Sequence, residues 1–164
     1  MIIYHGSNVV VEKPKILKSE RMLDFGRGFY TTSNKEQATR WAEIVAKRRE
    51  TKEQILSIYD FDNRAATDEL DILRFDKPDG EWLDFVCANR MGRKMSITYD
   101  IVIGPVADDK VYSVVQFYEH GVYDKDEAIK RLKVEELFDQ TLFHTEKALT
   151  YCRFAGFEKL GGSL

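Results

Sequence analysis

Four short stretches of this sequence hold residues whose types and spacing could do chemistry. They are "YHGS" at 4–7, "DFGRGFYTT" at 24–32, Trp41 and "DQTLFHT" at 139–145. In the first two, a histidine and a tyrosine lie beside glycines, whose backbone a ligand can approach closely because no side chain blocks it. Taken singly, each residue has a plainer explanation. A histidine at a strand end is usually a surface or capping residue, and a tyrosine in an apolar run is usually core.

Gly26 and Gly28 stand two apart beside bulky, strand-forming residues. Glycine serves where the backbone takes a positive φ or where another group approaches it closely. A hairpin bend and the wall of a ligand site would each explain the pair. Arg27, between the glycines, could contact a ligand, and Asp24 could simply cap or turn the chain.

Read together, "YHGS", "FGRGFYTT" and Trp41 resemble the ADP-ribosyltransferase fold, in its diphtheria-toxin and poly-ADP-ribose-polymerase branch. Members of that branch end a first strand with a His-Gly-Ser-type motif, follow it with an "FGKGIYF"-like segment, and carry a second aromatic residue on the next helix. The resemblance covers residues 1–50 well and the C-terminal part loosely, while residues 50–135 match no motif. More narrowly, the pattern "YHGS…DFGxGFYTT…FHTxxAL" looks like that of a small bacterial family of uncharacterised proteins grouped with these transferases.

The resemblance implies a site for NAD, as substrate, without a metal. Tyr30 and Trp41 would hold the flat, cationic nicotinamide ring by stacking and cation–π attraction. The backbone N–H and C=O of Gly6 would bind the carboxamide, and the His5 imidazole would hydrogen-bond a ribose hydroxyl. The other residues that the resemblance places at the cofactor are Ser7, Arg27 and Thr31.

The third stretch departs from the family pattern. If "DQTLFHT" is the third strand, Gln140 stands where these transferases commonly carry a glutamate. Glutamine can hydrogen-bond a ribose 2′-hydroxyl, but without a charge it cannot act as a general base or offset an oxocarbenium-like transition state. The resemblance therefore gives His5, Tyr30 and Gln140 as catalytic residues. His144, on the Gln140 face by strand alternation, and Glu146 are alternatives for the third position.

Several functions stay open at this point. The resemblance implies an NAD-dependent mono-ADP-ribosyltransferase-like enzyme that makes a single transfer to a macromolecule, a protein more than a nucleic acid. In small bacterial proteins of this fold, such activity commonly implies a toxin or effector, often neutralised by a small antitoxin partner. With water as acceptor, the enzyme would be an NAD glycohydrolase. The alternatives are a module that binds NAD or ADP-ribose without turnover, and a plain interaction domain with its aromatic residues in the core.

The composition is that of an ordinary soluble globular protein. Of 164 residues, 43% are hydrophobic and 32% charged, and the net charge of −3 argues against a general attraction to nucleic acid or acidic membranes. The sequence has no G-x-x-x-x-G-K-[ST], G-x-G-x-x-G, H-E-x-x-H or G-x-S-x-G motif. Two distant cysteines, no signal-peptide pattern and no long apolar run predict a cytoplasmic protein without disulfides, structural zinc or membrane contact.

Short strands and helices follow one another in no regular βαβ order, which predicts an α+β fold. The resemblance adds a split β-sheet core with flanking helices in a single domain, residues 1–160, and 161–164 read as a loose tail. Strands are predicted at 2–5, 28–32, 54–62, 99–104, 141–144 and 152–160. Helices are predicted after a Ser33 or Asn34 cap to about 49, and at 66–75, 79–92, 107–121 and 124–132, with a capped turn from 145.

Overall fold

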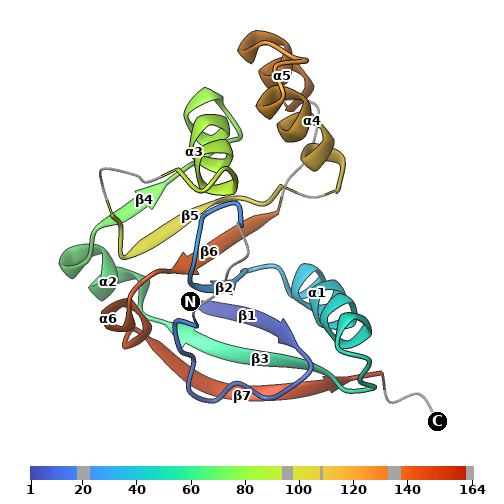
Figure 1. Cartoon of the computed structure of the whole chain (residues 1–164). Helices are drawn as coiled ribbons and strands as arrows, with labels where there is room; N and C mark the ends of the chain where they lie inside the picture. The colour runs from blue at the N-terminus through green and yellow to red at the C-terminus, as the bar shows by residue number, and fades with distance from the viewer. Residues whose placement is uncertain (18–22, 94–97, 108, 133–137, 162–164) are drawn as a thin grey trace.

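The computed structural model describes residues 1–17, 23–93, 98–107, 109–132 and 138–161. Its strands are β1 (Ile2–Ser7), β2 (Phe29–Thr31), β3 (Gln54–Phe61), β4 (Ile72–Arg74), β5 (Ile101–Pro105), β6 (Asp139–Phe143) and β7 (Cys152–Leu160). Its helices are α1 (Lys35–Arg48), α2 (Asn63–Glu69), α3 (Gly80–Arg90), α4 (Asp109–Glu119), α5 (Lys125–Leu132) and α6 (Glu146–Leu149). The described residues therefore form the predicted mixed α+β fold (Figure 1).

Two sheets organise these elements. One has the strand order β1-β3-β7 and is antiparallel throughout. The other has the order β2-β6-β5-β4, in which only the β4–β5 pair is parallel. Each sheet joins strands that are far apart in the sequence, β1 with β3 and β7 in one and β2 with β6 in the other. For example, the Thr31 hydroxyl donates to the Thr141 carbonyl, 110 positions later.

Most predicted elements are found with their ends moved by a few residues, but the predicted helix at 66–75 is only partly found: α2 covers residues 66–69 of it, and the rest is not helical. Helix α2 begins earlier, because the Asp62 side chain caps it by accepting from the Ala65 N–H at 3.0 Å. Residues 72–74 form β4 instead, because they pair with β5 in the register Ile72↔Ile101. Local propensity is overridden here by tertiary pairing. The predicted tail at 162–164 lies outside the described residues.

Two hydrophobic clusters lie on opposite faces of the β2-β6-β5-β4 sheet. Neighbouring residues on β6 enter different clusters, as strand alternation requires: Leu142 packs with α3, α4 and α5, and Phe143 packs with residues of β1 and β3. Helix α1 covers the β1-β3-β7 sheet with Ala38, Ala42 and Ala46 buried. Within the described ranges, no helix has the length and apolar character needed to cross a bilayer.

Candidate functional site

The two sheets meet where β1 runs beside β2, and an isolated bridge joins them. The Tyr4 N–H donates to the Thr32 carbonyl at 2.8 Å, and the Thr32 N–H donates to the Tyr4 carbonyl at 3.0 Å. If this antiparallel register continued, Gly6 would pair with Tyr30. No such pairing is found among the described residues, so β1 and β2 part beyond the bridge.

Gly6 is buried and lies on β1 just beyond the bridge, in the opening where β1 and β2 part. Successive residues of a strand point their backbone groups to opposite edges, so Gly6 points the same way as Tyr4, toward β2 and away from β3. In the described part of the chain, no partner for these two groups is found on that edge. One hydrogen-bond donor and one acceptor therefore lie side by side at the opening.

His5 occupies the place where the β1–β2 pairing would continue. Its Nδ1 lies 2.8 Å from the Tyr30 carbonyl, and because a carbonyl only accepts, Nδ1 carries the proton. Its ring packs against Phe29 with centroids 4.5 Å apart. Burial lowers the pKa of His5, against the smaller opposing effect of the Tyr30 carbonyl. The imidazole is therefore neutral at pH 7, with Nε2 left as an acceptor.

The glycine pair shapes the turn before β2. Gly26 has a φ of +88°, and the Tyr30 hydroxyl fixes the turn by donating to the Gly26 carbonyl at 2.7 Å and accepting from the Phe25 N–H at 3.2 Å. A Cβ on Gly28 would lie 2.3 Å from the Phe143 carbonyl oxygen, so glycine is needed for β2 to reach β6. Gly26 thus provides the bend, and Gly28 provides the close approach of β2 to β6.

Two further side chains lie at this turn. A Cβ on Gly26 would be 3.5 Å from His144 Cε1. Burial lowers the pKa of the His144 imidazole, against smaller opposing effects of the Arg27 and Phe25 backbone and of Asp100. Asp24 pairs with Arg90 on α3 at 3.2 Å, and Arg90 lies 3.6 Å from Glu119 on α4. Burial raises the pKa of Asp24, although Arg90 opposes the shift. Asp24 is thus an anchor to the helices rather than a simple cap.

Gln140 is buried and already hydrogen-bonded. It lies on the same face of the sheet as Tyr30, because Tyr30 pairs with Leu142. Its side chain is 7% exposed, and Nε2 donates to the Pro105 carbonyl at 3.4 Å. The same carbonyl accepts from the Trp82 indole N–H at 3.0 Å. The glutamine amide is therefore engaged within the protein.

Trp41 lies on α1, one helical turn after Gln37. The Gln37 Oε1 accepts from the Thr32 hydroxyl at 3.0 Å. Trp41 itself is 43% exposed, and the Arg48 guanidinium lies over its ring, 5.4 Å from the centroid. A cationic side chain already occupies the aromatic surface that the resemblance assigns to nicotinamide.

The other predicted residues have separate roles. Thr31 is buried and bonded to β6, Ser7 ends β1, and Arg27 is exposed in the turn. Glu146 is exposed at the start of α6, where its carboxylate accepts from the Ile16 N–H at 3.0 Å. Its place on α6 separates it from the strand position that Gln140 fills.

One residue at the bridge escaped sequence reasoning. Asp139 begins β6, and its carboxylate accepts from both the N–H and the hydroxyl of Ser33, just before α1. Its backbone carbonyl accepts from the Thr32 hydroxyl at 2.7 Å. Its position beside Gln140 in "DQTLFHT" was the signal that could have found it.

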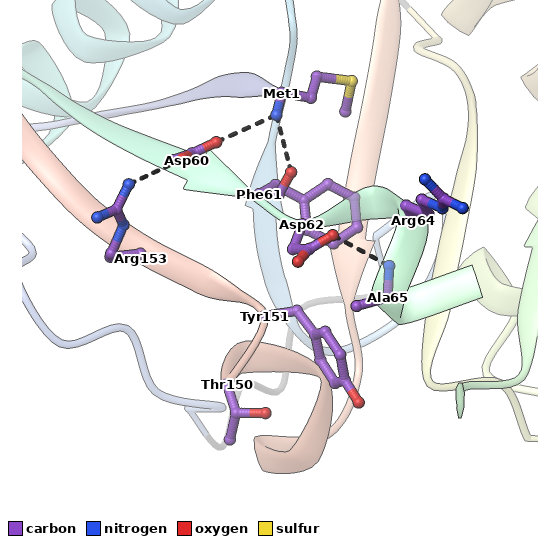
Figure 2. A pocket seen from close by; sticks show the side chains of 9 residues that line it. All are labelled: Met1, Asp60, Phe61, Asp62, Arg64, Ala65, Thr150, Tyr151 and Arg153. Carbon is purple, nitrogen blue, oxygen red and sulfur yellow. Dashed lines mark hydrogen bonds and ion pairs between the residues drawn. The ribbon is translucent and has the colours of Figure 1, made fainter. Parts of the chain in front are cut away.

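An open hollow of about 580 Å³ lies elsewhere, where β3 leads into α2 and β7 begins (Figure 2). Its charged side chains pair across the rim, with Arg153 3.0 Å from Asp60. No predicted site residue lines it. In the ranges that the structure describes, no group of three or more His, Cys, Asp or Glu side chains is arranged to hold a metal.

A family model described as "Protein of unknown function (DUF3990)" matches residues 1–154. The matched range contains both sheets up to the first residues of β7, together with His5, Tyr30 and Gln140. No curated protein and no solved structure matches the chain.

Proposed function

The chain belongs to the DUF3990 family, and from this premise we propose that it binds NAD at the opening between β1 and β2 and transfers its ADP-ribose to a protein. The bond between the ribose C1′ and the nicotinamide nitrogen breaks, with its electron pair leaving on nicotinamide. A nucleophile of the acceptor then bonds to C1′ and loses a proton. Two sheets that meet at a bridge and then part also support a split-sheet core of the ADP-ribosyltransferase type.

The observation that carries the proposal is the free edge of Gly6. A carboxamide offers one donor and one acceptor in a fixed plane, and the N–H and C=O of one strand residue complement both. A Cβ on Gly6 would lie 2.0 Å from the Ala38 carbonyl oxygen, so glycine is needed here for α1 to pack against β1. On this proposal, the missing side chain serves the packing of α1, and the backbone groups of the same residue bind the ligand.

His5 supports the proposal through its protonation state. With Nδ1–H bonded to the Tyr30 carbonyl, neutral Nε2 can accept a hydrogen bond from a ribose hydroxyl. The imidazole is held by two contacts, the carbonyl and the Phe29 ring, so that little freedom is lost when a ligand binds. Catalysis on this proposal rests on positioning, since Gln140 brings no charge to the reacting centre.

Gln140 also favours a second candidate, a module that binds NAD or ADP-ribose without turnover. Its amide is bonded to the Pro105 carbonyl, and moving it toward a ribose would leave that buried contact unmade. The two candidates share the binding site and differ only in whether nicotinamide is released.

The test is nicotinamide release from NAD by the purified protein, with and without cell lysate, alongside NAD binding measured by thermal shift. The key variant is His5→Gln, and the matched control is His120→Gln, because His120 is exposed and its Nδ1 bonds a carbonyl of its own helix. Saturation at a hundred times Kd stabilises a binder by about 2.7 kcal/mol. We expect this stabilisation in the parent and in His120→Gln, and its loss in His5→Gln.

Each outcome decides between the candidates. Release that needs lysate supports transfer to an acceptor, and release in buffer alone identifies a glycohydrolase. Binding without release supports the non-catalytic module. Absence of NAD binding by the parent protein contradicts the proposed site.

A further inference from the structure

We infer that two copies of this chain associate through β7, whose outer edge pairs antiparallel with β7 of the second copy and joins the two β1-β3-β7 sheets into one. Strand β7 lies at the outer side of its sheet (Figure 1). This edge is separated from the opening at Gly6 by β3, and its role goes beyond the proposed function.

The outer edge of β7 is long and open. The strand has nine residues, and none of them is buried. Among the described residues, no strand pairs with the edge of β7 that faces away from β3. An unpaired strand edge is a template for pairing with another chain.

The hydrogen-bond pattern shows which backbone groups lie on this open edge. Successive residues of a strand turn their N–H and C=O to opposite edges. Tyr4 turns its groups toward β2 at the bridge, so the next residue of β1 turns them toward its partner Ser57 on β3. Ser57 therefore faces β1, and Leu56 faces β7, where it pairs with Glu158. Since Glu158 faces β3, its two neighbours in the chain turn their N–H and C=O outward.

A β-bulge limits where a second strand can be added. The register of β3 and β7 shifts between Ile58 and Tyr59, which makes Ala155 the extra residue of the bulge. Bulges protect natural sheet edges from unspecific pairing, because they bend and twist the strand. From Gly156 to Leu160 the pairing with β3 is regular, and a second strand can follow this segment.

The side chains of this segment complement a second copy of themselves. Phe157 is 48% exposed, and Lys159, two residues later, is exposed on the same face of the sheet. Among the described residues, the Phe157 ring contacts no other ring and the Lys159 ammonium forms no ion pair. In a pairing centred on Phe157, this ring lies opposite Phe157 of the second copy. Lys159 then lies diagonal to the ring of the second copy, where a cation–π contact forms.

The charges along the edge agree with this register. Glu158 lies on the opposite face and pairs with Lys35 on α1 at 2.7 Å, so its charge is already balanced. It stands opposite Gly156 of the second copy, and no like charges are directly opposite one another. The exposed ring and the exposed cation meet each other only across two copies, which favours a second copy over an unrelated strand.

The test is sedimentation velocity of the full chain over a range of concentrations. Strand pairing along a short segment buries little surface, so the association should be weak, and the mass should rise with concentration from 19.1 kDa toward twice that value. Phe157→Lys places two cations opposite each other and should weaken the association by about tenfold. The matched control is Phe117→Lys, because Phe117 on α4 is also 44% exposed and should leave the association unchanged.

Amide hydrogen exchange of the parent locates the contact. The N–H groups of Phe157 and Lys159 should exchange several-fold more slowly as the concentration rises, whereas the Glu158 N–H, which faces β3, should be protected at every concentration. Lys159→Glu is a second variant at an exposed position. It removes the cation and should also weaken the association, whether or not Phe157→Lys folds.

The other outcomes overturn the inference. A mass of 19.1 kDa at every concentration would show that the copies do not associate. Association that both variants leave unchanged, or that does not slow exchange at Phe157, would place the contact on another surface. A monomer whose Phe157 N–H is protected only after another protein is added would assign the edge to a different partner. None of these measurements involves NAD, so each outcome leaves the proposed function to its own test.

Discussion

The two edges of β2 are built differently. On one edge, β2 pairs with β6 along its whole length, and Gly28 lets the backbones come into contact. On the other edge, β2 meets β1 at the Tyr4–Thr32 bridge and then leaves it. The closed edge pairs the backbone groups of β2 with those of β6, whereas at the open edge the N–H and C=O of the buried Gly6 have no partner on β2 among the described residues.

The difference shows how one short strand can be both scaffold and site. The Tyr30 side chain fixes the turn at Gly26, and the Tyr30 carbonyl fixes His5 at the opening. The contacts at the closed edge of β2 thus fix the geometry at its open edge. Substitutions at the closed edge should lower the free energy of unfolding, and substitutions at the open edge should weaken NAD binding.

The largest effect is expected where a Cβ would strike backbone. Gly28→Ala places a methyl group 2.3 Å from the Phe143 carbonyl oxygen, and Gly6→Ala places one 2.0 Å from the Ala38 carbonyl oxygen. Each should lower the free energy of unfolding by about 3 kcal/mol, since overpacked backbone must move. Urea denaturation checks this, with Gly121→Ala as the control.

Gly121 has a φ of +71° but no neighbour within 4 Å of a built Cβ. Gly121→Ala should therefore cost only about 1 kcal/mol, from backbone conformation alone. Equal losses in all three variants would mean that close approach is not what Gly6 and Gly28 provide.

A smaller loss is expected from Tyr30→Phe, which keeps the ring and removes the hydroxyl that bonds Gly26 and Phe25. Leaving these two backbone groups without their partner should cost about 1.5 kcal/mol of unfolding free energy. NAD binding should persist because the Tyr30 side chain belongs to the closed edge. Loss of binding with unchanged stability would contradict this assignment.

The smallest effect concerns pH. The pKa values of His5 and His144 lie below the ordinary value, so the unfolded chain binds more protons just below pH 6.5, and stability falls as pH falls. Stability should therefore fall between pH 7 and 5.5, and Asp24, whose raised pKa acts in the opposite direction, should reduce the loss.

Single substitutions of His144 and His5 distinguish the closed edge of β2 from its open edge. His144→Gln and His5→Gln should each flatten the fall in stability measured by denaturation at several pH values. Only His5→Gln should also remove NAD binding, because His144 lies at the Gly26 turn, where its Cε1 is 3.5 Å from the place of a Cβ on Gly26. Equal binding by both variants and the parent would contradict the assignment of His5 to the opening.

Local signals predicted much of the fold. The Asn34 cap and the helical spacing of Ala38, Ala42 and Ala46 indicated α1, and β7 is found at the predicted residues. Strand alternation correctly put Leu142 and Phe143 on opposite faces. These features depend on residues a few positions apart. Over that distance, the spacing in the sequence decides which side of a helix or strand a residue lies on.

The site depends on contacts that no local pattern records. Asp24 meets Arg90 across 66 positions, and β4 exists because residues 72–74 pair with β5. The opening at Gly6 arises from strands that fail to continue pairing, which the residue types of neither strand specify. The sequence pattern singled out His5, Gly6 and Tyr30, which lie on β1 and β2. Only the structure shows that Gly6 lacks a partner on β2 among the described residues and that the Gln140 amide bonds the Pro105 carbonyl.

The pairing of β2 with β6 has a consequence for how the protein is made. Contacts between residues more than a hundred positions apart give slow folding, because a long loop must close before they form. During synthesis, β1 and β2 leave the ribosome before β6, and β2 has no β6 partner until residues 139–143 emerge. Until then, the nascent chain carries His5, Gly6 and Tyr30 without the pairing that holds β2 in place.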